Sequence, residues 1–304
     1  MVSAVFHSPS DASDALRADK ACAKPPLTPM TAVSAPTATA CAQPARAPFD
    51  WAGWALKLLS PVAGLALLVG IWALLTMKST TFPTPLQTWD AAVVLFSDPF
   101  YSNGPNDQGI GWNIWFSLKR VAMGFGLAAL VGIPMGFIIG RSQVIGGMLN
   151  PIISLLRPVS PLAWLPIGLL VFKSADPAAI WTIFICSIWP MIINTAVGVQ
   201  RVPEDYLNVA KVLNLSEWKI VTKILFPSVL PYMLTGVRLS VGTAWLVIVA
   251  AEMLTGGVGI GFWVWDEWNN LNVQHIIIAI FVIGIVGLLL ENALVAIAKR
   301  FSFE

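Results

Sequence analysis

Long apolar runs, separated by short polar segments, fill the chain from residue 51 to the C-terminus. A helix needs about 20 predominantly apolar residues to cross the hydrocarbon core of a bilayer. The pattern therefore predicts an all-α, polytopic membrane protein with about six transmembrane helices. The predicted spans are residues 54–77, 121–140, 148–172, 178–199, 231–255 and 276–298.

The third of these spans has an interrupted pattern. Arg157, Pro158 and Pro161 lie within it, and proline both removes a helical hydrogen bond and clashes with the preceding turn. The run could split into an interfacial helix and a shorter spanning helix. A count of five or seven spans therefore remains open.

Composition places the chain among membrane proteins, because 57% of its residues are hydrophobic, only 11% are charged and the mean hydropathy is +0.75. The formal net charge is only +2, without a dense block of Lys and Arg, so no nucleic-acid partner is expected. The 3 cysteines and 2 histidines are scattered along the sequence. Neither a disulfide framework nor a metal site is therefore predicted.

The sequence predicts three parts. Residues 1–50 are rich in Ala, Pro, Ser and Thr and lack the pattern of a secretory signal, which predicts a disordered cytoplasmic tail. Residues 51–111 contain the first transmembrane helix and an amphipathic segment, around residues 86–96, on the outer surface. Residues 112–304 form the transmembrane core, which includes a cytoplasmic loop at 201–230.

The distribution of Lys and Arg predicts the orientation, because positively charged loops tend to stay in the cytoplasm. These residues gather in alternate segments, whereas the 255–274 loop contains Asp266 and Glu267 but neither Lys nor Arg. Both termini are therefore expected inside. Lys119 and Arg120 break the rule at the outer end of the second span, where long basic side chains can snorkel to the interface.

The 201–230 loop is long enough to form its own structure. A helix is predicted from Pro203, Asn214 tolerates the left-handed backbone of a turn, and Ser216 can cap a second helix that ends at Pro227. This helix-turn-helix would lie at the membrane surface, with an apolar face toward a cytosolic partner. The predicted apolar positions are Tyr206, Val209, Ala210 and Leu213 in the first helix and Trp218, Val221, Ile224 and Leu225 in the second.

The same loop resembles the coupling loop of ABC importer permeases, which has the pattern Glu-Ala-Ala, three residues, Gly, nine residues, Ile-x-Leu-Pro. The spacing matches fully; Ala210, Ile224 and Pro227 match in identity, whereas Asn208 and Asn214 replace Glu and Gly. Asn208 cannot make an anionic contact. The resemblance implies that the loop couples the chain to an ATPase through Asn208, Val209, Ala210, Asn214, Ile224, Phe226 and Pro227.

The resemblance extends from Asn113 to the C-terminus. Over this length the chain is similar to the nitrate, taurine and sulfonate branch of the binding-protein-dependent, MetI-like permeases. Within this branch, the run at 124–128 favours the nitrate, nitrite and cyanate type. Segments typical of the branch are Ser117-Leu118-Lys119-Arg120-Val121, Gly132-Ile133-Pro134, Arg157-Pro158, Ala163-Trp164-Leu165-Pro166 and Ala250-Ala251-Glu252-Met253.

This family resemblance implies a transport subunit of the bacterial inner membrane that works by alternating access. The expected partners are a second permease subunit, two cytosolic ABC ATPase subunits and a periplasmic substrate-binding protein. The two permease subunits could form a homodimer, which is the expected form, or a heterodimer. No cofactor is expected in this chain, because it lacks the Gly-x4-Gly-Lys-Ser/Thr loop that cradles ATP phosphates. ATP and Mg would be used by the partner ATPase.

Nitrate is the expected substrate, and taurine, other sulfonates or bicarbonate remain open. An enzyme is not expected, because no Ser or Cys pairs recognisably with a His base. The alternatives are a stand-alone secondary transporter or channel and a membrane scaffold that recruits a cytosolic partner. Inverted repeats would favour the secondary transporter, and none is evident in the sequence.

Ionisable residues at membrane depth are costly and are therefore candidates for a transport pathway or a gate. Arg157 and Arg238 would attract an anion. Alternatively, both lie near inner helix ends, where arginine caps carbonyl groups and contacts lipid headgroups. Glu252 would repel an anion, so a gating or helix-packing hydrogen bond is the expected role of its carboxylate.

Overall fold

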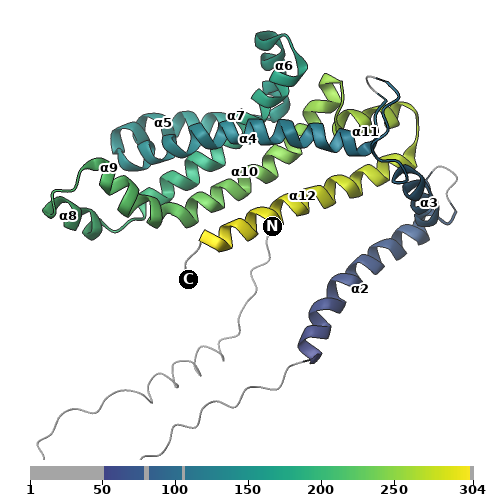
Figure 1. Ribbon diagram of the computed structural model, residues 1–304, viewed down its shortest axis with the longest axis horizontal. Coiled ribbons are helices and arrows are strands. Elements are labelled where there is room, and N and C mark those ends of the chain that lie inside the picture. Colours follow the sequence, from purple (N-terminus) through teal and green to yellow (C-terminus); the bar gives the residue numbers. More distant parts are fainter. Residues whose placement is uncertain (1–50, 79–81, 105–106, 302–304) are drawn as a thin grey trace, which may run out of the picture. The chain divides into compact units, whose positions relative to one another are not determined.

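The computed structural model describes residues 51–78, 82–104 and 107–301 (Figure 1). The chain divides into two units, residues 1–59 and 60–304, and the predicted tail at 1–50 lies outside the described residues. The described part is helical, with one isolated β-bridge between Ser102 and Gln108. The helices are α2 Trp51–Thr76, α3 Pro85–Leu95, α4 Ile110–Arg141, α5 Gln143–Leu156, α6 Pro161–Phe172, α7 Ala175–Gln200, α8 Glu204–Val212, α9 Glu217–Ile220, η2 Val221–Leu225, α10 Phe226–Thr255, α11 Ile260–Asn269 and α12 Val273–Phe301.

The predicted all-α membrane architecture is confirmed. Five described helices are long and apolar enough to cross a membrane, and the pair α5 and α6, bent by 99°, makes up to six. The break falls where prolines interrupt the third predicted span, and Ser160 has extended backbone because Pro161 follows it. Pro161 in turn lies in the first turn of α6, where its missing N–H is not needed.

Two helices begin well before the apolar runs from which they were predicted. α4 begins at Ile110, 11 residues before the predicted start at 121. α10 is continuous with η2 and α9, so this helical stretch begins at Glu217 rather than at 231. In both cases polar and charged residues interrupt the apolar pattern while the backbone hydrogen bonds of the helix continue.

The amphipathic segment predicted at 86–96 forms α3. Its first turn is a capping box, in which the Thr84 hydroxyl accepts from the Gln87 N–H and the Gln87 side chain accepts from the Thr84 N–H at 3.0 Å. Pro85 follows at the first helical position. α3 packs against α12.

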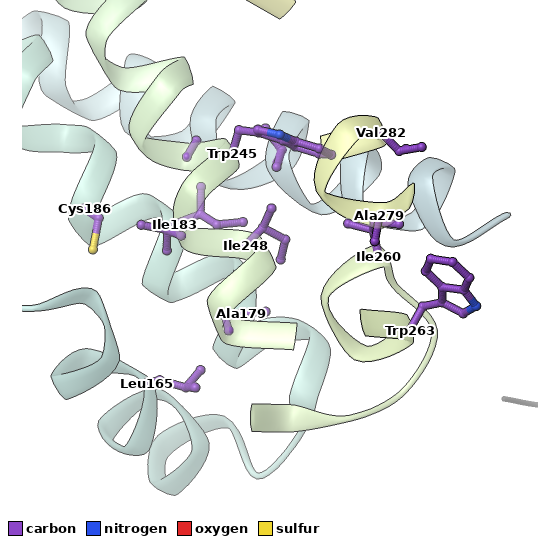
Figure 2. Close-up of a cluster of buried hydrophobic side chains, with 14 of the residues drawn as sticks. Leu165, Ala179, Ile183, Cys186, Trp245, Ile248, Ile260, Trp263, Ala279 and Val282 are labelled. Carbon is purple, nitrogen blue, oxygen red and sulfur yellow. The ribbon is translucent and has the colours of Figure 1, made fainter. Parts of the chain in front are cut away.

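The core of the 60–304 unit consists of α4, α7 and α10, with α7 packed against both of the others (Figure 1). Glycines on α4 allow the close approach: a Cβ atom at Gly136 would lie 2.6 Å from the Thr195 Cβ atom of α7, and one at Gly140 would lie 2.6 Å from that of Val199. Figure 2 shows the buried apolar cluster that continues from α7 through Ile248 of α10 to α11 and α12.

Candidate functional site

The loop between α7 and α10 folds around a left-handed turn. α8 ends at Val212, and Asn214 has φ 48°, a backbone conformation that asparagine tolerates better than most residues. The Leu215 N–H then donates to the Ala210 carbonyl at 3.1 Å. Ser216 occupies the position before α9, although its side chain makes no capping hydrogen bond. The predicted turn at Asn214 is therefore present.

Pro227 does not end the second helix, and that prediction is wrong. The helix passes through a π turn, in which the Phe226 N–H donates to the carbonyl of Val221, five residues earlier. A proline within an α-helix lacks its N–H and clashes with the carbonyl four residues earlier, whereas a wider π turn gives the ring room. α9, η2 and α10 therefore form one continuous helical stretch from the loop into the core.

Ala210 does not share the outward apolar face predicted for it. Its side chain is 0% exposed and packs with residues of α7, the α9–η2 segment and α10. The opposite side of α8 is open, because Tyr206 and Val209 are both 57% exposed and Leu213 is 64% exposed. Trp218 of α9 is also exposed. We call Tyr206, Val209, Leu213 and Trp218 the apolar loop face.

The other residues of the predicted coupling motif occupy different environments. Asn208 and Asn214 are exposed and Ile224 is half-buried. Phe226 stacks on Phe137 of α4, with ring centroids 6.5 Å apart. Pro227 is exposed in the first turn of α10. The motif therefore joins the loop to the bundle on one side and leaves an open surface on the other.

Two further features connect the loop with the end of α4. Arg141 lies 3.6 Å from the Glu217 carboxylate of α9, and both side chains are exposed. A pocket of about 590 Å³ separates the α4–α5 turn from α8 and is lined by Arg141, Gln143, Gln200 and Glu204 among others. One exposed ion pair therefore links the loop to the end of α4, and a cavity lies beside it.

A buried ionic cluster lies at the opposite ends of α4 and α10, with Glu252 at its centre. This residue is 1% exposed. The Arg120 guanidinium donates to its Oε1 atom at 2.7 Å, the Ser117 hydroxyl lies 2.7 Å from Oε2, and the Gly261 N–H donates to Oε2 at 3.0 Å. A carboxylate buried in this way needs such partners, because an unpaired charge would be very costly.

Arg120 of α4 contacts three other segments of the chain. It donates to Glu252 of α10, to the Val258 carbonyl in the turn before α11 at 2.6 Å, and to Asp176 in the first turn of α7 at 2.8 Å. The expectation that Arg120 snorkels to the interface is therefore wrong. Lys119 beside it is exposed.

The cluster also satisfies the first backbone groups of α11. Asn113 accepts from the Gly259 N–H and Ser117 from the Ile260 N–H, each at 2.9 Å. A Cβ atom at Gly261 would lie 2.1 Å from a backbone oxygen, so only glycine fits there. Asn113, Ser117 and Arg120 recur at intervals of four and three residues, and this polar face of α4 is the signal in the sequence that could have revealed the cluster.

The three ionisable pathway candidates occupy separate places. Glu252 lies in the buried cluster. Arg238, in the middle of α10, donates to Glu291 of α12 at 2.9 Å, and both side chains are about half exposed. Arg157 is exposed at the end of α5.

Comparison with known proteins gives a consistent result. Residues 132–302 match the model of the family described as "Binding-protein-dependent transport system inner membrane component". A nitrate import permease protein NrtB of Leptolyngbya laminosa is 51% identical over 234 residues, which cover 77% of this chain and 84% of that protein. A bicarbonate transport system permease protein CmpB of Synechocystis sp. is 44% identical over 246 residues, covering 80% and 88% respectively.

The fold is also similar to that of a solved transporter. An inward-facing structure of the MetNI methionine ABC transporter has a chain that aligns with a TM-score of 0.58 at 14% identity. The alignment covers 63% of this chain and 95% of that one. At this level of identity the similarity concerns the fold alone.

Proposed function

Since this chain belongs to the family of binding-protein-dependent transport system inner membrane components, we propose that it is the permease subunit of an ATP-driven importer for a small inorganic anion. The observation that carries the proposal is the loop between α7 and α10. It presents exposed apolar side chains on one side and is built into the helical core on the other.

The apolar loop face is the proposed docking surface for the ATPase. Four large apolar side chains, Tyr206, Val209, Leu213 and Trp218, surround the α8–α9 turn and are each more than half exposed. Exposed apolar patches of this kind mark interaction surfaces. Since α9, η2 and α10 are continuous, a displacement of the loop would be transmitted along α10 into the core.

The proposed assembly contains two permease subunits, as a homodimer, with two cytosolic ATPase subunits and a periplasmic binding protein. ATP and Mg belong to the ATPase. Both termini and the loop face the cytoplasm in this arrangement, and the ionic cluster around Glu252 lies near the outer surface. ATP binding would bias the helices between inward-facing and outward-facing states, which is alternating access.

Nitrate is the proposed substrate. The support is the name of the Leptolyngbya relative, which shares 51% of the aligned residues. Bicarbonate is the second candidate, because the Synechocystis bicarbonate permease is 44% identical over a similar length. Both ions are small, planar and singly charged, so the same pathway could accept either.

Purification of the tagged chain from its native host in mild detergent tests the assembly. An ABC ATPase should co-purify with the wild-type chain in equal molar amount. The Val209→Asp variant should purify without the ATPase. Lys219→Asp, an exposed change on the same segment that leaves the apolar loop face intact, is the matched control. Recovery of the wild-type chain without any ATPase, in the detergent that preserves related complexes, would count against the proposal.

A further inference from the structure

Arg157 differs from Arg120, Arg141, Arg201 and Arg238 because it has no partner among the residues that the structure describes. Within residues 51–78, 82–104 and 107–301, no hydrogen bond, ion pair or ring contact to its guanidinium is found. The arginines that do have a partner are Arg120 with Glu252 and Asp176, Arg141 with Glu217, Arg201 with the Tyr232 ring, and Arg238 with Glu291.

The position of Arg157 corresponds to the middle of the bundle rather than to its end. Ile153, one helical turn earlier, packs in one cluster with Ile188 and Ile192 of α7. Ile188 lies near the midpoint of α7, which has 26 residues. Arg157 also follows the 14 residues of α5, about 21 Å of helix at 1.5 Å per residue. A charge at such depth faces a polar cavity or a functional site.

Arg157 is exposed and lines an open pocket of about 540 Å³ together with Asn150, Ile153, Ser154, Pro158 and Ile193. Asn150, Ser154 and Arg157 are spaced by four and three residues, so they lie on one face of α5. The side chains of Asn150 and Ser154 also make no hydrogen bond within the described residues. Among the described residues that line the pocket, none is acidic.

We propose that Asn150, Ser154 and Arg157 form the site at which the transported oxyanion binds within the membrane. A guanidinium presents two parallel N–H groups, which match two oxygens of a planar oxyanion such as nitrate or hydrogencarbonate. The Asn150 amide and the Ser154 hydroxyl supply further donors. The helix break after Leu156 places these groups beside irregular backbone, as in other transporters whose sites lie at broken helices.

This inference rests on the proposed function for the identity of the anion, but the position of the site can be tested without measuring transport. In a variant with Cys22, Cys41 and Cys186 replaced by alanine, Ser154→Cys provides one thiol in the proposed site. The measurement compares its rates of modification by an anionic sulfonate methanethiosulfonate and a cationic trimethylammonium methanethiosulfonate, in the assembled complex. Adding Arg157→Gln should lower the anionic-to-cationic rate ratio on the order of tenfold, because the local positive charge is lost.

Two comparisons make the result specific. Arg238→Gln, which removes an arginine already paired with Glu291, should leave the ratio unchanged. Nitrate should slow modification of the Ser154→Cys thiol when Arg157 is present, and it should have no effect when Arg157→Gln is added. A ratio that does not respond to Arg157→Gln, or a thiol at 154 that neither reagent reaches, would overturn the proposed site.

Uptake into proteoliposomes separates this inference from the proposed function. The wild-type complex should take up nitrate with ATP. Arg157→Gln should reduce the uptake rate on the order of tenfold to a hundredfold, as expected for a lost charge-assisted contact. Arg157→Lys should restore part of the uptake rate. An uptake rate and KM in Arg157→Gln equal to those of the wild type would contradict the proposed binding site but not the proposed function. Absence of uptake by the wild type would contradict the proposed function and leave the labelling result to decide the site.

Discussion

The Arg120 guanidinium lies 2.7 Å from the Glu252 carboxylate, although 132 residues separate them in sequence. The pair is inside the bundle, where the Arg120 side chain is 13% and the Glu252 side chain 2% exposed. Through Ser117, Val258 and Gly261 it also fixes the turn between α10 and α11. These contacts join the ends of α4, α7 and α10 into one unit.

Glu252→Ala should destabilise the protein strongly. The change leaves Arg120 with Asp176 as its remaining acidic partner and deprives the Gly261 N–H of its acceptor, and breaking a buried pair costs about 3–5 kcal/mol. Thermal unfolding in detergent measures the effect. Glu217→Ala is the matched control, because its pair with Arg141 at the loop end of the bundle is exposed and is worth about 1 kcal/mol or less. Equal melting temperatures for the two variants would contradict this role of Glu252.

Enlarging Gly136 tests the contact between α4 and α7. A Cβ atom there would lie 2.6 Å from the Thr195 Cβ atom, and overpacking of this kind costs about 1–3 kcal/mol. Gly126→Ala is the control on the same helix, because nothing lies within 4 Å of the added atom. Gly136→Ala should therefore lower the melting temperature and Gly126→Ala should leave it unchanged or raise it. The reverse order would mean that the two helices pack differently.

Ala210 and Val209 are neighbours with opposite environments, so the same substitution should have different consequences. Ala210→Asp places a carboxylate at a site that is 0% exposed, where an unpaired charge is very costly. The loop should then become sensitive to limited proteolysis. Val209→Asp changes an exposed position, so the loop should stay resistant while the ATPase no longer co-purifies. Proteolysis of both variants at equal rates would contradict the buried position of Ala210 and the exposed position of Val209.

Asn214 should tolerate glycine better than valine. Its φ of 48° lies in the left-handed region, which is strained for a β-branched residue and free of strain for glycine. Asn214→Val should cost about 1–3 kcal/mol, seen as a lower melting temperature, while Asn214→Gly stays close to wild type. Matched stability of the two variants would argue against the left-handed turn.

Local patterns in the sequence were sufficient for the fold. The apolar runs predicted the helices, the prolines at 158 and 161 predicted the break between α5 and α6, and Asn214 predicted the turn. Contacts between distant residues were not predictable in this way. In the sequence Arg120 resembles an interfacial anchor, but in the fold α10 brings Glu252 beside it. Ala210 resembles an exposed apolar position, but in the fold it is buried in one cluster with Val229 and Met233.

Pro227 illustrates a second limit of sequence reasoning. Proline disfavours the interior of a helix, but here a π turn at Val221–Leu225 precedes Pro227 and the helix continues into α10. The residues of that turn do not differ visibly from those of an ordinary α-helical turn. The continuity of the loop with α10, on which the proposed coupling depends, is therefore a result of the structure.

ATP-dependent uptake of labelled nitrate is the most direct test of the proposed function. The complete complex, reconstituted in proteoliposomes with its ATPase and binding protein, should accumulate nitrate only when ATP and the binding protein are both present. Val209→Asp should abolish accumulation while the chain remains folded and inserted. Nitrate uptake that proceeds without ATP, or that is unaffected by Val209→Asp, would contradict an ATP-driven permease coupled through the apolar loop face.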